Sequence, residues 1–206
     1  MMQAMIFAAG LGTRLKPLTD HMPKALVRVG GEPLLKHVVV QMKNAGFTHV
    51  VVNVHHFADQ IEEYLAAQQN FGIDIRISDE RQQLLNTGGG IKKARPLFDS
   101  TEPILIHNVD ILSNVDLRGF YAQAHGDATL LVSERQTKRY LLFNPNEGHR
   151  LMGWTNIETH ELRSPHAGLN SDSCERYAFS GITCSAPVFF PCSTSGPTSL
   201  ASSTST

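Results

Sequence analysis

Two fixed positive charges follow a glycine-rich turn close to the start of this 206-residue chain. Gly10 and Gly12 come directly after a short apolar segment, and Arg14 and Lys24 follow them. Glycines let backbone N–H groups approach an anion without an intervening Cβ, and consecutive N–H groups on such a turn form an anion-binding concavity. An arginine fork and a lysine point charge supply the counter-charge that a polyphosphate requires. The segment is therefore predicted to hold a triphosphate; the alternative is that either cation is a solvated surface charge.

The spacing of this segment excludes two common phosphate-binding loops. The dinucleotide fingerprint G-x-G-x-x-G needs a third glycine where this chain has Leu15, and the G-x-x-x-x-G-K-[ST] loop needs a lysine that is absent. A lone G-x-G after a strand would also fit an ordinary strand-to-helix turn. The two glycines alone are therefore a weak signal, and the specific signal is the whole string, G-x-G-T-R-L-x-P-L-T-x-x-x-P-K.

A single carboxylate, Asp110, follows the apolar run at residues 103–109. A carboxylate just past a buried strand has little structural reason to be there, although a capping or turn role is the alternative. Magnesium prefers one or two carboxylates together with phosphate oxygens and water. Asp110 is therefore a candidate ligand for Mg²⁺.

A second glycine-rich segment, Asn86–Gly90, is expected to open a helix over residues 91–98. Its glycines would let a nucleotide base lie against the backbone, and a helix N-terminus favours anions. Gln83 is placed to hydrogen-bond a base edge, with an ordinary surface glutamine as the alternative. His55 and His56 end an expected strand without a third ligand in a suitable spacing, so we interpret them as loop histidines.

Strand and helix patterns alternate along the first ~135 residues, as apolar periodicity indicates. The alternation predicts an α/β fold with a Rossmann-like, doubly wound, mostly parallel sheet and helices on both faces. A small antiparallel insertion is expected over residues 140–157, which read as two strands joined by an Asn/Gly turn. Expected strands are 3–8, 48–54, 73–78, 103–111 and 128–134, and expected helices are 33–45, 58–69, 91–98 and 116–125.

Composition limits the classes of partner. The net charge of −1 gives no reason to expect nucleic-acid or membrane-surface binding. No apolar run is long enough for a membrane span or a signal peptide. The cysteines Cys174, Cys184 and Cys192 lie late and form no C-x-x-C pair, which fits a reduced cytoplasm.

The string from Gly10 to Lys24 resembles the signature of the sugar-1-phosphate nucleotidyltransferases, which join an NTP and a sugar 1-phosphate. The resemblance implies a domain over residues 1–182, with a nucleotide-binding core at 3–135 and a sugar-side part at 136–182. The short length and the segment L-L-x-T-G-G-G-I look most like bacterial enzymes acting on N-acetylmuramate, mannose or heptose 1-phosphates. Expected partners are UTP, GTP or dTTP and a sugar 1-phosphate, with Mg²⁺ as cofactor.

The same resemblance implies roles for individual residues. Arg14 would hold the β- and γ-phosphates, Lys24 would bridge the phosphates of the two reactants, and Asp110 would bind the metal, although Val109 stands where the family commonly has glycine. The implied nucleotide-binding residues are Ala8, Ala9, Gly10, Gly12, Thr13, Gln83, Thr87 and Gly88. The implied sugar-binding residues are Asn156 and Gly181. Trp154 could stack on a sugar, but we interpret it as a core residue.

The last part of the chain departs from the family. A second metal-binding aspartate is expected near the end of the domain, yet no acidic residue follows Glu175. Residues 183–206 are rich in Ser, Thr and Pro and show no apolar periodicity. Back-translated with permitted codons and read one nucleotide earlier, they give HVLSPGLFPLLDEWPDKFSIIDFY, which has a strand, a helix and a closing strand with an aspartate and resembles the end of such a domain. We interpret residues 183–206 as a frameshifted or mis-assembled reading frame; a natural disordered tail is the alternative.

Two functional hypotheses follow. The first is a nucleotidyltransferase that acts by in-line attack of the sugar phosphate on the α-phosphorus of the NTP, with release of pyrophosphate. The second is a catalytically impaired nucleotide-binding remnant that lacks the second metal-binding aspartate. The base, the sugar and the oligomeric state are left open by the sequence.

Overall fold

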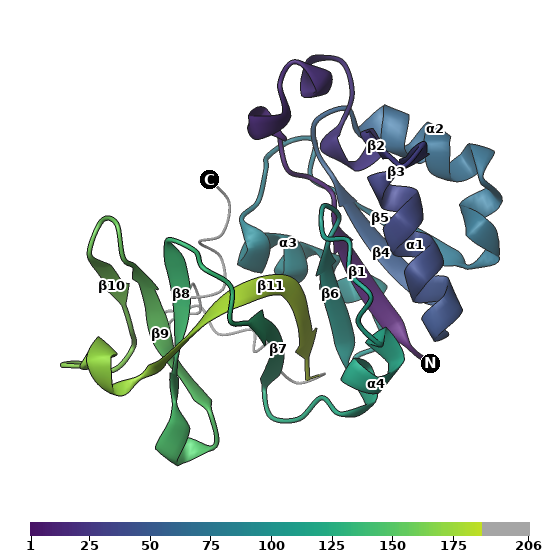
Figure 1. Cartoon of the computed structure of the whole chain (residues 1–206). Coiled ribbons are helices and arrows are strands. Elements are labelled where there is room, and N and C mark those ends of the chain that lie inside the picture. The colour runs from purple at the N-terminus through teal and green to yellow at the C-terminus, as the bar shows by residue number, and fades with distance from the viewer. Residues whose placement is uncertain (187–206) are drawn as a thin grey trace. The chain divides into compact units, whose positions relative to one another are not determined.

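A computed structural model of the chain describes residues 1–186; residues 187–206 lie outside the described part (Figure 1). The chain divides into two compact units. Among the described residues, unit 1 comprises Met1–Thr129 and residues 182–186, and unit 2 comprises Leu130–Gly181.

The sheet of unit 1 contains four parallel strands in the order β5–β4–β1–β6. The chain passes outward from β1 through β4 to β5 and then returns to the other side of β1, so the strand order reverses between β1 and β6. Ligands of doubly wound sheets bind beyond the carboxyl ends of the strands at such a reversal. The bounds are β1 Gln3–Phe7, β4 His49–Val54, β5 Asp74–Asp79 and β6 Ile104–Asn108.

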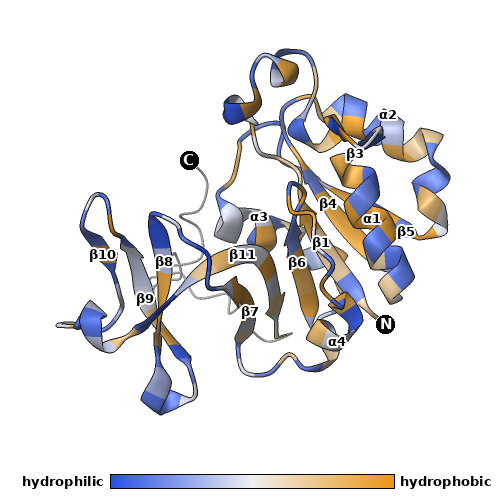
Figure 2. Ribbon diagram, viewed as in Figure 1, coloured by the Kyte–Doolittle hydropathy of each residue, from blue (hydrophilic) through white to orange (hydrophobic). Residues whose placement is uncertain are grey.

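Both faces of this parallel sheet are buried. Every residue of β4 is buried, four of its six residues are valine, and Figure 2 shows most of the strand as hydrophobic. On one face, Met5, Val51 and Ile106 pack with Ala94 of helix α3. Because side chains alternate along a strand, the neighbouring residues point to the opposite face, where they are again fully buried: Ala4, Ile6, Val50 and Val52.

The helices of unit 1 begin and end where local chemistry requires. Helix α1 buries one apolar stripe and ends at Gly46, whose φ of 97° is the left-handed conformation typical of a helix C-cap. Helix α4 begins after Asp116, whose carboxylate accepts a hydrogen bond of 3.0 Å from the Gly119 N–H group. The helices are α1 Leu34–Ala45, α2 Ala58–Ala67, α3 Thr87–Ala94 and α4 Leu117–Ala122.

Unit 2 is an antiparallel sheet in the order β10–β9–β8–β11, to which β11 contributes its first residues. Its core contains Leu141, Phe143 and Trp154. The last residues of β11, from Ile182 to Ser185, pair antiparallel with β6 in unit 1. The bounds are β8 Arg139–Asn144, β9 Arg150–Asn156, β10 Glu161–Arg163 and β11 Glu175–Ser185; the remaining strands are β7 Ala128–Ser133, which pairs with β11, and the short hairpin of β2 Arg28–Val29 and β3 Glu32–Pro33.

The expected α/β class and the antiparallel insertion are confirmed, but the sheet is mixed: within residues 1–186, parallel pairing is confined to β5, β4, β1 and β6. The helix expected over residues 91–98 is wrong in its position, since α3 covers Thr87–Ala94. Its first turn closes when the Gly90 N–H group donates to the Asn86 carbonyl at 2.8 Å. Helix α3 ends at Ala94 and continues into the 3-10 turn Arg95–Leu97, because Pro96 has no N–H group to extend the α-helical hydrogen bonds.

The tail expected at residues 183–206 falls largely outside the described residues, although Thr183–Ser185 belong to β11. Within residues 1–186, no helix is long and apolar enough to cross a membrane.

Candidate active site

The loop after β1 folds around Gly12. This residue has a φ of 65°, which suits glycine, and its carbonyl accepts a 2.9 Å hydrogen bond from the Thr19 hydroxyl. A Cβ on Gly12 would lie 2.9 Å from Thr19 Cγ2 and 3.0 Å from Lys24 Cβ. Gly10, by contrast, has no atom within 4 Å of a built Cβ. The loop therefore closes tightly at Gly12 and leaves open space at Gly10, where an anion could approach the backbone.

The two predicted cations have different surroundings. Arg14 lies in the short 3-10 turn Thr13–Leu15, is exposed, and forms no ion pair within residues 1–186. Lys24 is more enclosed, with 18% of its side chain exposed, and its ammonium forms an ion pair with the carboxylate of Asp110. The loops after β1 and β6 are thus joined by opposite charges at the point where the strand order reverses.

The strand that leads to Asp110 contains a buried imidazole, that of His107. His107 is fully buried in β6, and its Nδ1 donates to the Asn108 carbonyl at 2.8 Å. Burial lowers the pKa of His107 below its usual value, although the hydrogen bond to Asn108 and the charge of Asp110 act in the opposite direction. His107 is therefore neutral at pH 7 and leaves Asp110 with Lys24 as its charged partner.

The nucleotide-binding residues predicted after β5 lie at the start of α3. Thr87 and Gly88 form its first turn, and a Cβ on Gly88 would meet no atom within 4 Å. Gln83 is exposed in the turn before α3, where its N–H group donates to the Glu80 carbonyl at 3.0 Å. These residues present open backbone at a helix N-terminus, which suits a phosphate or a base.

Ala8 and Ala9 follow β1 directly, and their backbone N–H groups already have a hydrogen-bond partner. Their N–H groups donate to the side-chain oxygen of Asn53, at 2.7 and 3.2 Å. Asn53 in turn donates to the buried carboxylate of Glu80. Neither polar residue was predicted, because Asn53 lies inside an apolar run and Glu80 lies in a charged turn. The available signal was a lone amide near the end of a buried strand.

The predicted sugar-side residues belong to unit 2. Asn156 is buried, and its side-chain oxygen accepts from the Glu158 N–H group at 3.0 Å, which is a turn-forming contact. Gly181 has a φ of 77° within β11. Trp154 is 4% exposed in the core, which confirms its interpretation as a core residue, and Arg163 lies over its ring at 5.3 Å.

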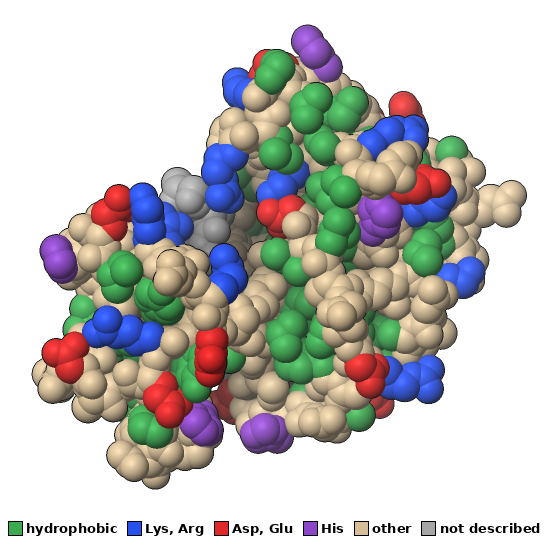
Figure 3. Space-filling view, viewed as in Figure 1, with side chains coloured by type: hydrophobic (Ala, Val, Ile, Leu, Met, Phe, Trp, Pro, Cys, Tyr) green, Lys and Arg blue, Asp and Glu red, His purple; other side chains and the backbone are tan. Residues whose placement is uncertain are grey.

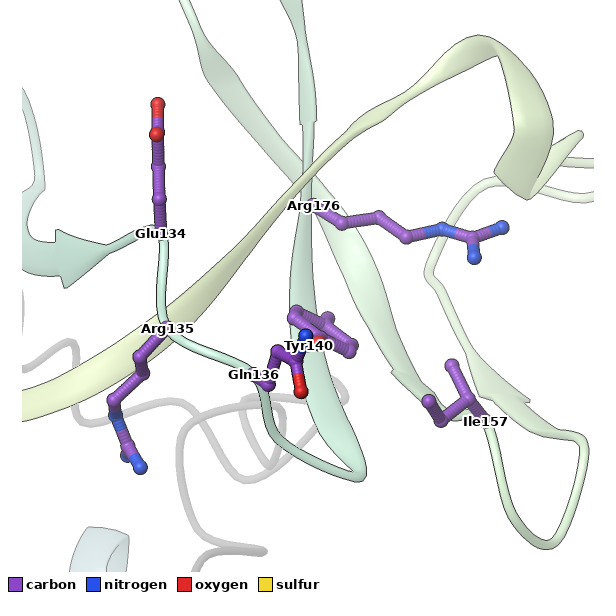
Figure 4. Close-up of a pocket in the computed structure, with 6 residues that line it drawn as sticks. All are labelled: Glu134, Arg135, Gln136, Tyr140, Ile157 and Arg176. Carbon is purple, nitrogen blue, oxygen red and sulfur yellow. The ribbon is translucent and has the colours of Figure 1, made fainter.

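Each unit carries a pocket. The pocket of unit 1 has a volume of about 290 Å³ and lies along the phosphate loop, lined by Leu11, Thr13, Lys16, Thr19, Asp20 and His56. The pocket of unit 2 has a volume of about 330 Å³, and Figure 4 shows Tyr140 and Arg176 projecting from β8 and β11; its lining is Glu134, Arg135, Gln136, Tyr140, Ile157 and Arg176.

Elsewhere the charges are dispersed. Figure 3 shows basic and acidic side chains interspersed over the visible face, without one large patch of a single sign. No cluster of three or more His, Cys, Asp or Glu residues suited to a metal ion occurs within residues 1–186. A magnesium ion at Asp110 would therefore take most of its ligands from phosphate oxygens and water, which is the donor set that Mg²⁺ commonly uses with nucleotides.

Comparison with known proteins identifies the family to which this arrangement belongs. A profile of the family described as nucleotidyl transferase matches residues 3–140, which include the glycine loop, Lys24 and Asp110. The chain belongs to the nucleotidyl transferase family. The match covers the parallel strands of unit 1 and extends into β8 of unit 2.

Two curated relatives are N-acetylmuramate alpha-1-phosphate uridylyltransferases. The protein from Caulobacter vibrioides is 49% identical over 109 residues, covering 52% of this chain and 45% of the relative. The protein from Neisseria meningitidis serogroup B is 38% identical over 144 residues, covering 70% of this chain and 60% of the relative. The chain thus matches about half the length of these relatives.

A solved structure has the same fold. A putative glucose-1-phosphate thymidylyltransferase from Bacillus anthracis, in complex with a sucrose, superposes with a TM-score of 0.70. The superposition covers 91% of this chain and 72% of that one, at 19% sequence identity. This likeness establishes the fold of the described residues.

Proposed function

We propose that this nucleotidyl transferase joins an NTP and a sugar 1-phosphate to give a nucleotide sugar and pyrophosphate. The observation that supports it most directly is the Lys24–Asp110 ion pair, which joins the loops after β1 and β6 where the strand order reverses. Two anions must meet in this reaction, so the main tasks are charge neutralisation and alignment. A fixed cation and a carboxylate in adjacent loops suit both tasks.

In this proposal each residue has a defined task. Arg14, free of any ion pair in residues 1–186, binds the β- and γ-phosphates and stabilises the charge of the leaving pyrophosphate. Lys24 exchanges its contact with Asp110 for the phosphates of the two reactants. The open backbone of the glycine loop (Gly10, Gly12, Thr13) and of the start of α3 (Thr87, Gly88) binds the nucleotide, and Gln83 contacts the base edge. Ala8 and Ala9 contribute their carbonyl side, because Asn53 occupies their N–H groups.

Asp110 would hold a magnesium ion, which supplies charge neutralisation at the phosphates when bound. Asn156 and Gly181 are proposed to contact the sugar. The names of the two curated relatives make UTP and N-acetylmuramate α-1-phosphate the first pair of substrates to test, followed by GTP or dTTP with other sugar 1-phosphates. The impaired remnant is the second candidate, since no acidic residue follows Glu175 to provide a second metal ligand.

Pyrophosphate release from a panel of NTPs and sugar 1-phosphates tests the proposal. We expect one pair to support turnover and Arg14→Ala to lower kcat/KM by roughly 10²–10³, as loss of a charge-stabilising group does. Lys92→Ala, which removes an exposed lysine of α3, is the matched control and should behave like the parent. Nucleotide binding without turnover of any pair would favour the remnant, and an Arg14→Ala variant within about threefold of the parent would contradict the role of Arg14.

A further inference from the structure

A buried polar chain connects the two loops that the proposed function assigns to the nucleotide. Asn53 is the penultimate residue of β4, which pairs with β1, and its side-chain oxygen accepts from the N–H groups of Ala8 and Ala9, at 2.7 and 3.2 Å. Its amide nitrogen donates to Glu80 Oε1 at 2.8 Å. The other oxygen, Glu80 Oε2, accepts from the Leu85 N–H group at 3.0 Å. The chain therefore runs from the start of the phosphate loop to the segment that precedes α3.

The chemistry of this chain fixes the identity of both side chains. Backbone N–H groups only donate, so the oxygen of Asn53 must face Ala8 and Ala9, and its amide nitrogen must face residue 80. Residue 80 then receives two donors, one from Asn53 and one from Leu85. A carboxylate accepts both, whereas a glutamine would turn one donor against another.

Because Asn53 and Glu80 are buried, losing one of these hydrogen bonds would be costly. Glu80 is 0% exposed and Asn53 is 2% exposed. A buried polar group that loses its partner costs more than the hydrogen bond alone contributes, because the group is not returned to water. Breaking an exposed ion pair, such as that of Lys138 with Glu158, has no comparable cost, because water solvates both groups.

Helix α3 is packed directly against this chain. A Cβ on Gly90 would lie 2.8 Å from Glu80 Oε1 and 3.4 Å from the amide nitrogen of Asn53. The third glycine of the T-G-G-G segment is therefore required by contact with Glu80, whereas Gly88 faces open space. The position of the helix that starts at Thr87 depends on the same two side chains.

We propose that Asn53 and Glu80 are positioning residues that set the phosphate loop and the start of α3 in the arrangement that binds the NTP. The inference rests on the proposed function of these loops. Neither side chain touches the reactants: Asn53 acts through the backbone of Ala8 and Ala9, and Glu80 acts through Leu85 and Gly90. Loss of these hydrogen bonds of Asn53 and Glu80 should weaken nucleotide binding and leave the binding of the sugar 1-phosphate unchanged.

A double exchange provides a sharp test. In N53D the new carboxylate faces that of Glu80, and in E80Q the new amide faces a second donor, so each single variant breaks the chain. Together they restore it in reverse: Asp at 53 accepts from Ala8, Ala9 and Gln at 80, whose oxygen accepts from Leu85. The buried charge is the same as in the parent, and a double-mutant cycle isolates the coupling.

The measurements are thermal unfolding, and UTP and GTP affinity by calorimetry, for the full chain in its four forms, with Glu63→Gln on the exposed side of α2 as the control. We expect each single variant to raise the Kd of the bound NTP about tenfold or more, and the double variant to return within about threefold of the parent. Where turnover is measurable, KM for the NTP should follow Kd while KM for the sugar 1-phosphate stays constant. A merely structural defect would lower the active fraction, and hence kcat, without moving either KM.

Two results would overturn the proposal: single variants that bind NTP like the parent, or a folded double variant that binds no better than the weaker single variant. If a single variant does not fold, the double variant still decides. A parent that binds no NTP would overturn the proposed function and the positioning role with it. The melting temperatures of the cycle would then still report whether Asn53 and Glu80 are coupled.

Discussion

Lys24 and Asp110 neutralise each other from two loops that are far apart in the sequence. The pairing was not predicted, although each residue was identified from its own context: Lys24 from the string that begins at Gly10, and Asp110 from its place after a buried strand. Only the parallel pairing of β1 with β6 brings them together. The ion pair with Asp110 compensates the charge of the partly enclosed Lys24.

The first prediction for single residues concerns the charge of Asp110. Asp110→Asn should reduce pyrophosphate release by roughly 10²-fold or more and abolish its dependence on Mg²⁺, because the amide is a poor ligand for a hard cation and leaves Lys24 without its partner. Magnesium titrations of parent and variant provide the measurement. Glu158→Gln, which breaks an exposed ion pair of unit 2, is the control. A variant with the magnesium dependence of the parent would show that Asp110 is not a ligand.

At the scale of elements, the glycine loop depends on a single left-handed position. Gly12 and Gly126 have the same φ of 65°, but a Cβ at Gly12 would meet Thr19 and Lys24, whereas one at Gly126 would meet nothing within 4 Å. Alanine at either position costs roughly 1–2 kcal/mol for the left-handed backbone. The steric conflict at Gly12 adds about 1–3 kcal/mol.

Gly12→Ala should therefore lower the melting temperature by several degrees more than Gly126→Ala, since about 1 kcal/mol corresponds to ~2–4 °C in a chain of this size. It should also weaken NTP binding, because Lys24 must move away from the new methyl group. Thermal unfolding and calorimetry of the two variants measure both effects. Equal melting temperatures would mean that the Gly12 turn relaxes without cost.

Much of the fold could be predicted from the sequence because its signals are local. The apolar stripe of α1 and the continuous burial of β4 follow from side-chain spacing, and both elements begin and end within a residue of the expected bounds. The start of α3 could not be predicted in this way. Its glycines indicate a turn, yet they lie within α3, where Gly90 packs against Glu80 with no room for a Cβ.

The residues of the candidate site also differ in whether local sequence signals could identify them. The residues with open or charged surroundings, such as Arg14 and Gly88, are visible from motif and spacing. Asn53 and Glu80 are not, because their importance depends on hydrogen bonds between strands distant in the sequence. Asn156 shows the opposite case: the motif suggests a sugar contact, and its side-chain oxygen is used by a local turn.

At the scale of the whole molecule, the family and the fold do not determine the substrate. One fold serves many chemistries. In addition, the chain matches only 45% and 60% of the length of the two curated relatives. The net charge is −1, and charges of both signs are interspersed on the face shown in Figure 3. The choice of base and sugar has to come from the substrate panel.

The last prediction concerns the reading frame after Ile182. Strand β11 continues to Ser185 beside β6, and Cys184 and Ser185 are 1% and 3% exposed. The alternative frame places Val and Leu at these two buried positions and supplies an aspartate further on. Each 100 Å² of apolar surface buried is worth about 2.5 kcal/mol, against a total stability of about 5–15 kcal/mol.

A protein in which HVLSPGLFPLLDEWPDKFSIIDFY follows Ile182 should therefore melt at a higher temperature than the 206-residue chain and should turn over faster, since the metal gains a second carboxylate. Both proteins are expressed and compared by thermal unfolding and pyrophosphate release. Replacing the aspartate of the IIDFY segment by asparagine is the control that separates the two effects: it should keep the gain in stability and lose the gain in rate. If the chain as written melts as high and reacts as fast as the altered protein, residues 183–206 are a natural tail and the frameshift interpretation is wrong.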